Sequence, residues 1–193
     1  FYDEQFDIQT AFVIIAHSEE QKGFPERAFE TYQKALLILP GLSRVLFQEV
    51  LLLCCRMNRF DRGIEFINGD YASLPEGLVF QTLCFPSSEE IGSLERTDLG
   101  NKSNEVLNQV FGLLNKEQEE NKKGKVLVSL ACAYACKQNG LWEQTIDWLE
   151  KANTILLTDR TAQICLKNWS QEISTVVPGD FQSFLQQRSE EHT

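Results

Sequence analysis

Residues 10–40 read TAFVIIAHSEEQKGFPERAFETYQKALLILP, and they contain two apolar segments on either side of a short break. In the first segment, Phe12 and Ala16 recur at the spacing of one helix face. Gly23 lies in the break, and Pro25 follows it at a position where a helix can begin, because a proline in the first turn loses no hydrogen bond. The segment therefore predicts two helices joined by a tight turn and folded back on each other.

Five positions of this segment fall at the offsets of the tetratricopeptide (TPR) motif. They are a turn glycine, two small residues, an aromatic residue between these two, and a closing proline: Gly23, Ala28, Tyr32, Ala35 and Pro40. Small side chains let helices approach closely, an aromatic ring fills the space between units, and a proline ends the second helix. The segment thus resembles a TPR unit, which implies an all-α fold of stacked helix pairs.

A second unit with the same pattern follows at 45–75. Asn58 stands at the turn position, Gly63 at a small position, and Pro75 closes the unit. One helix pair cannot bury its own apolar faces, so repetition is what such a fold requires.

The whole chain is therefore expected to be one TPR-like domain, and the Phe1 start with Met57 as the only methionine indicates a fragment of a larger protein. The resemblance implies a right-handed solenoid of three to four antiparallel helix pairs with a C-terminal capping helix. The expected units are 10–40, 45–75, an irregular 78–118 and 126–157, with a cap at 160–185. We expect the charged stretch 116–125 to be a solvated helix end and linker, and the polar tail 186–193 to be disordered.

Composition excludes several classes of protein. The chain has 193 residues, 42 % hydrophobic and 24 % charged, which is typical of a globular domain. Its net charge of −10 repels phosphate, so nucleic acid is not an expected partner. No apolar run approaches the length of about 18 residues that a membrane span needs.

The six cysteines all occur within apolar, helix-like runs, as in VLLLCC at 50–55. Free cysteine behaves there as a small apolar residue, which predicts buried thiols and a reducing, intracellular location in the cytoplasm or nucleus. Cys132 and Cys136 share a helix face, but a metal site needs four ligands, and the only histidines are His17 and His192.

No motif of catalysis is found in the sequence. The glycine-rich patterns GxGxxG and GxxxxGK[ST] are absent, and a nucleophile would depend on His17 as its only internal histidine base. We therefore expect no enzyme activity and no cofactor.

The TPR resemblance implies that the first helix of each unit lines a concave, peptide-binding groove. Carried over position by position, it gives eight candidate partner-binding residues: Val13, His17, Gln48, Leu52, Arg56, Leu130, Tyr134 and Lys137. This largely apolar set suits an amphipathic helix or an extended segment. A second interpretation stays open, in which Leu52 and Leu130 pack inside the chain or against other parts of the parent protein.

The sequence thus predicts a non-catalytic module that binds another protein, as an adaptor or scaffold. The acidic surface favours a basic or amphipathic partner segment. Two alternatives are an RNA-binding helical repeat of the pentatricopeptide type and a regulatory domain of a larger enzyme.

Overall fold

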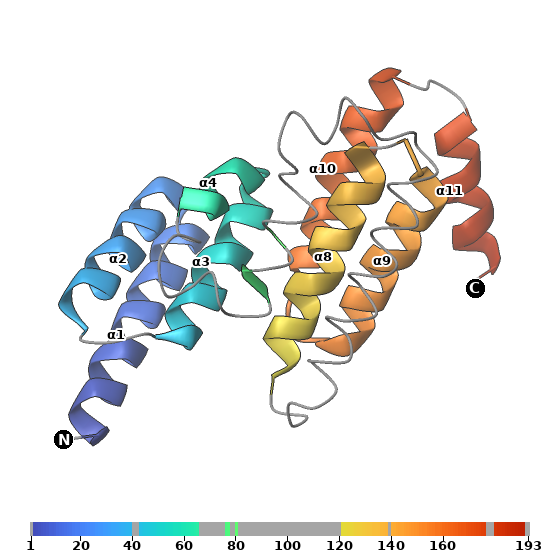
Figure 1. Ribbon diagram of the computed structural model, residues 1–193. Coiled ribbons are helices and arrows are strands. Elements are labelled where there is room, and N and C mark those ends of the chain that lie inside the picture. Colours follow the sequence, from blue (N-terminus) through green and yellow to red (C-terminus); the bar gives the residue numbers. More distant parts are fainter. Residues whose placement is uncertain are drawn as a thin grey trace, which may run out of the picture.

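The computed structural model describes residues 2–39, 43–65, 76–77, 80, 121–138, 140–176 and 180–191. In these ranges every regular element is a helix, which confirms the all-α prediction (Figure 1). The helices are α1 (Tyr2–Gln21), α2 (Pro25–Ile38), α3 (Arg44–Arg56), α4 (Phe60–Glu65), α8 (Lys122–Gln138), α9 (Trp142–Ile155), α10 (Thr161–Val176) and α11 (Asp180–Glu191).

Three tight turns join consecutive helices, and those at Gly23 and Asn58 stand at the turn positions predicted from the sequence. Gly23 lies between α1 and α2 with φ +88°, and Gly140 precedes α9 with φ +72°. Asn58, between α3 and α4, also has a positive φ, of 56°. This left-handed conformation is open to glycine and tolerated by asparagine, which explains why these residues stand at the turns.

Polar side chains cap the starts of the helices that build the centre of the fold. The Ser43 hydroxyl accepts a hydrogen bond from the Leu46 amide at the start of α3, at 3.4 Å. The Asn121 side chain does the same for Gly124 in α8, at 3.2 Å. Helix α2 begins instead with Pro25 and with the acidic Glu26 in its first turn, near the positive end of the helix dipole.

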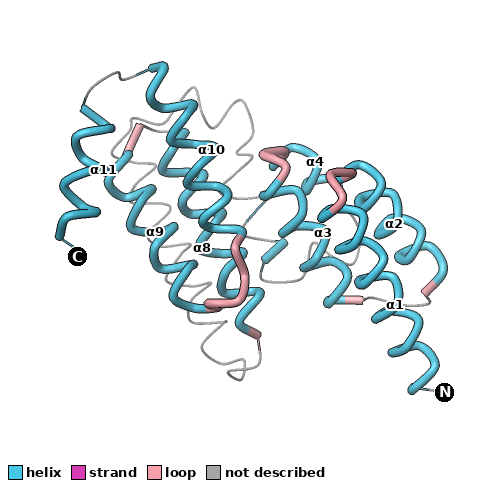
Figure 2. The backbone as a smooth tube through the Cα atoms, turned by 180° about the vertical axis from the view of Figure 1, so that it is seen from behind, coloured by secondary structure: helices cyan, strands magenta, loops and turns pink. Residues whose placement is uncertain are grey.

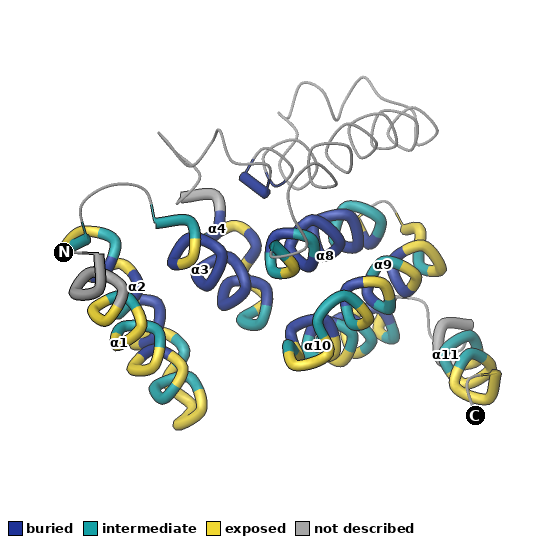
Figure 3. Tube along the Cα trace, turned by 90° about the horizontal axis from the view of Figure 1, so that it is seen from below, coloured by how far each residue is buried: buried dark blue, intermediate teal, exposed yellow. Residues whose placement is uncertain are grey.

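Helix α3 is the centre of the molecule, with α1 and α2 on one side and α8 and α10 on the other (Figures 1 and 2). Ten consecutive residues, from Leu46 to Cys55, are buried, so the helix has no solvent-exposed face along this length (Figure 3). Its side chains divide between two apolar clusters. Leu46, Val50, Leu53 and Cys54 pack with α1 and α2, whereas Phe47, Leu51, Leu52 and Cys55 pack with α4, α8, α9 and α10.

An aromatic cluster ties α4 to α8 and α10. The rings of Phe60 and Tyr134 stack with centroids 4.2 Å apart, and Trp169 lies 5.7 Å from Phe60. The Trp169 indole donates a hydrogen bond to the Asn58 side chain at 3.0 Å. The turn between α3 and α4 is thereby fixed to α10, more than a hundred residues away.

Several helix boundaries differ from the sequence-based expectation. Helix α1 starts at Tyr2 rather than near residue 10, and α8 starts at Lys122, inside the expected linker. The tail 186–193 is expected to be disordered, but it is helical as far as Glu191, where α11 ends. The guanidinium group of Arg188 forms ion pairs with Asp147 and Glu150 on α9, and these contacts hold α11 against α9.

The prediction of buried thiols is confirmed for four cysteines, and Cys136 is half-buried. Cys84 and the irregular unit 78–118, apart from Phe80, lie outside the described residues. Among the described helices, none has both the length and the apolar character needed to cross a bilayer.

Candidate functional site

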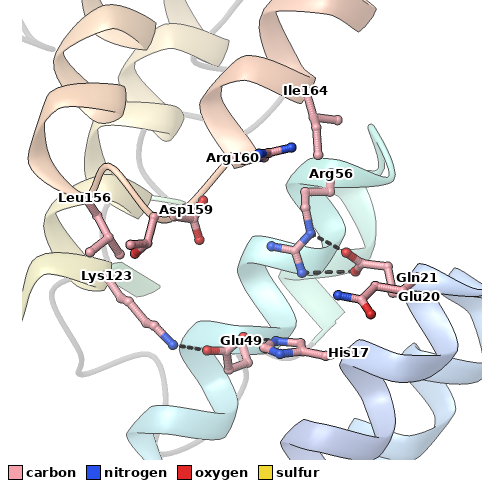
Figure 4. Close-up of a pocket in the computed structure, with 11 residues that line it drawn as sticks. His17, Glu20, Gln21, Glu49, Arg56, Lys123, Leu156, Asp159, Arg160 and Ile164 are labelled. Atoms are coloured by element: carbon pink, nitrogen blue, oxygen red, sulfur yellow. Dashed lines mark hydrogen bonds and ion pairs between the residues drawn. The ribbon is translucent and has the colours of Figure 1, made fainter.

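A cleft of about 410 Å³ opens between the N-terminal and C-terminal helices (Figure 4). One wall comes from α1 and α3, and the other from the start of α8, the segment between α9 and α10, and the first turn of α10. Its lining residues are His17, Glu20, Gln21, Glu49, Arg56, Lys123, Leu156, Thr158, Asp159, Arg160 and Ile164.

Glu49 forms the floor of the cleft and joins its two walls. His17 Nε2 on α1 lies 3.1 Å from one carboxylate oxygen, and the Lys123 ammonium on α8 binds the other. Burial would raise the pKa of Glu49, but the hydrogen bonds from His17 and Lys123 outweigh it and lower that pKa to about 2. Glu49 is therefore a carboxylate at neutral pH.

Arg56 makes a second connection across the same cleft. Its guanidinium group binds both oxygens of Glu20 on α1, at 2.8 and 3.0 Å, and donates to the Thr161 hydroxyl on α10 at 3.0 Å. Burial would lower the pKa of Arg56, but Glu20, with Asp159 and Glu49 nearby, raises it. A bidentate arginine–carboxylate pair has a defined geometry, so this contact holds α1, α3 and α10 in register.

The structure brings together two of the eight residues predicted for partner binding. His17, one turn before the end of α1, and Arg56, the last residue of α3, both line the cleft (Figure 4). Val13, one turn before His17, is half-buried and packs against the cluster formed with α2 and α3.

Three other candidates lie inside the molecule, so they line no open groove in this structure. Leu52 and Leu130 are buried in the larger apolar cluster, because α8 and α10 cover the surface of α3 that the resemblance left open. Gln48 is also buried, and its amide donates to Glu76 at 3.0 Å and to Asn121 at 2.7 Å. For Leu52 and Leu130, this burial is what the packing interpretation of the sequence expects.

Tyr134 and Lys137 belong to the aromatic cluster rather than to the cleft. The Lys137 ammonium lies 5.7 Å from the Tyr134 ring centroid and 5.4 Å from that of Trp169, and it pairs with Glu172 at 2.9 Å. A cation over aromatic faces is stabilised by the ring quadrupoles, so a buried lysine is accommodated here.

Sequence reasoning missed most of the cleft. Only Glu49 carried a usable signal, since it is the single charged residue in the apolar run 45–55 and a buried carboxylate needs partners. Lys123, Asp159 and Arg160 had no such signal. They lie in polar stretches and reach the cleft through contacts between distant parts of the chain.

Two thiols in the described part of the chain have raised pKa values. Burial raises the pKa of the Cys165 thiol to about 12, and burial with the nearby Asp147 raises that of Cys136 to about 11, so both thiols are protonated at neutral pH. No group of three or more His, Cys, Asp or Glu side chains suited to a metal ion occurs in the ranges that the structure describes.

Comparison with known proteins returns no match to a family model, to a curated protein or to a solved structure.

Proposed function

We propose that this chain is a non-catalytic interaction module that binds a segment of a partner protein in the cleft between its two groups of helices. The observation that carries the proposal is the cleft itself, which has a volume of about 410 Å³ and is lined largely by charged side chains. This volume is within the usual range for pockets that take small ligands or a few side chains. In the cell the module would act as an adaptor or scaffold within a larger assembly.

The contacts across the cleft support binding over catalysis. Glu49 and Arg56 are engaged by hydrogen bonds from both walls, so the cleft has a fixed shape before a partner arrives. A preformed site loses less conformational entropy on binding, which favours recognition. The protonated state of Cys136 and Cys165 argues against a thiolate nucleophile.

In this proposal the pairs α1–α2, α3–α4 and α8–α9 are TPR-like units of one solenoid. The positive φ at Gly23, Asn58 and Gly140 supports this relation, because each pair turns at the motif's turn position. The cleft then takes the place of the predicted groove, with His17 and Arg56 in common between the two and with an amphipathic helix or extended peptide as the ligand.

A substitution that fills the cleft without changing its charge tests the proposal. Gln21 is an exposed residue of the lining, and Gln33 is also exposed, on α2 outside the cleft. We would compare Gln21→Trp with the matched control Gln33→Trp, after checking by circular dichroism that both variants fold. Each would serve as bait for cross-linking and capture from cell extract.

The expected result is a partner captured by the unmodified chain and by Gln33→Trp but lost with Gln21→Trp. Equal capture by all three proteins would place binding elsewhere on the molecule and contradict the proposed site.

A further inference from the structure

The charged groups of the cleft differ in how far they reach into solvent. The Glu49 side chain is only 3 % exposed and that of Glu20 is 28 % exposed, and both are bound by cations of the chain. In contrast, His17 is 46 % exposed and Lys123 is 40 % exposed. A ligand that enters the cleft therefore meets His17 and Lys123 before it meets Glu49 and Glu20, although the chain as a whole carries a net charge of −10.

Arg160 is the basic group best placed to bind a ligand. It is exposed at the edge of the cleft, and no hydrogen bond or ion pair engages its guanidinium group among the described residues. The neighbouring Asp159 instead accepts a hydrogen bond from the Thr161 amide at 2.7 Å, at the start of α10. Figure 4 shows the Arg160 side chain extending toward the wall that carries Arg56.

The two apolar residues of the lining, Leu156 and Ile164, are half-buried and lie on either side of Arg160 in the sequence. A guanidinium group binds a carboxylate through two parallel hydrogen bonds, and an aliphatic side chain gains from burial against leucine and isoleucine. The cleft thus offers the Arg160 guanidinium group for a carboxylate beside the aliphatic side chain of Ile164, whereas Leu156 lies on the far side, near Lys123 (Figure 4).

We infer that the cleft recognises an aspartate or glutamate side chain within a partner polypeptide, held by Arg160, with an adjacent aliphatic side chain packed against Ile164, one helical turn after Arg160. This inference rests on the proposed function, because it names the chemistry of the partner bound there. It also gives a source of specificity: an acidic segment is repelled by the negative surface as a whole and attracted locally by the basic edge of the cleft.

The test is a selection of short random peptides, displayed internally so that no free carboxyl terminus is presented, against the full chain. The selected peptides are then measured against Arg160→Glu and against Lys34→Glu, which makes the same charge change on an exposed residue of α2. A third variant, Arg160→Gln, removes the charge without reversing it and covers the case in which Arg160→Glu disturbs the fold.

The expected result is enrichment of peptides with Asp or Glu beside an aliphatic residue. Their affinity should fall about tenfold or more with Arg160→Glu, fall less with Arg160→Gln, and stay unchanged with Lys34→Glu.

Other outcomes overturn the inference and separate it from the proposed function. The inference of an acidic partner is contradicted if the enriched peptides are rich in Lys or Arg, or if they bind Arg160→Glu as well as the unmodified chain. In either case the chain would still be a peptide-binding module. A labelled oligouridylate that binds through Arg160, in place of any peptide, would identify a phosphate site and overturn both proposals. A selection that enriches no peptide also contradicts both.

Discussion

At the scale of single residues, Glu49 is the most informative position. It is a buried carboxylate whose charge is stabilised by His17 and Lys123, from two different helices. Its pKa of about 2 lies below the ordinary value of 4.5. This difference makes the stability of the folded chain depend on pH, because the unfolded chain takes up a proton at a higher pH than the folded one.

For Glu49 the stabilisation is complete above about pH 4.5 and is lost as the pH falls toward 2. Its size is about 3 kcal/mol in the free energy of unfolding. We expect Glu49→Gln to remove this part of the pH dependence and to be less stable than the unmodified chain at pH 7. Denaturant unfolding between pH 2 and 7 measures it, with Glu30→Gln on the exposed surface of α2 as the control. Parallel pH curves for both variants would contradict the assignment.

Tyr32 gives a second prediction at this scale. Its hydroxyl is buried and has no hydrogen-bond partner in the described part of the chain, and burial, with Glu49 nearby, raises its pKa. A buried hydroxyl that has lost its hydration without gaining a hydrogen bond destabilises the fold. We expect Tyr32→Phe to raise the free energy of unfolding by about 1 kcal/mol, measured by urea denaturation. A loss of similar size would show that the hydroxyl is hydrogen-bonded in solution.

At the scale of helices, α3 differs from an ordinary amphipathic helix because it is covered on all sides. We expect Leu52→Glu to unfold the chain, since an unpaired carboxylate would be buried among apolar side chains. Val45→Glu is the matched control on the same helix, where Val45 is 45 % exposed and near the helix start. Circular dichroism distinguishes the two. A folded Leu52→Glu chain would show that α8 and α10 do not cover this surface.

The turn between α3 and α4 depends on two properties of Asn58, its positive φ and its bond to Trp169. Asn58→Asp keeps an acceptor and tolerates the same φ, so we expect stability close to that of the unmodified chain. Asn58→Ala loses both, and we expect a loss of about 2–4 kcal/mol. Asn58→Gly removes the backbone strain but also the hydrogen bond to Trp169, so its stability should lie between those of Asn58→Asp and Asn58→Ala. Thermal unfolding followed by tryptophan fluorescence gives this order, and equal stability of all three would exclude both roles.

The elements also show which parts of the fold could be predicted from the sequence. The turns at Gly23 and Asn58 were predictable because a positive φ is a local property of one residue. The burial of Leu52 and Leu130 was not, because the same apolar stripe suits an open groove or a covered core. What decides between these is the contact of α3 with α8 and α10, which no local pattern encodes. Arg160 was missed for the same reason.

At the scale of the whole molecule, the two groups of helices should unfold together. Their apolar clusters share α3, which contributes opposite faces to each. All three tryptophans lie in α9 and α10, so fluorescence reports on the C-terminal helices, while far-ultraviolet circular dichroism reports on every helix. We expect coincident urea transitions by the two methods. An earlier transition by circular dichroism would show that α1 and α2 unfold on their own.

The enclosure of α3 also has a consequence for the synthesis of the chain on the ribosome. The thiol of Cys165 in α10 contacts the backbone of Cys55 in α3, 110 positions earlier. During translation, the face of α3 that receives α10 thus waits for its native cover until about 110 further residues have been made. Apolar surface exposed in this interval is prone to aggregate. Chaperones that bind apolar surface would therefore protect the nascent chain during this interval. The length of the interval is set by the separation of α3 and α10 in the sequence.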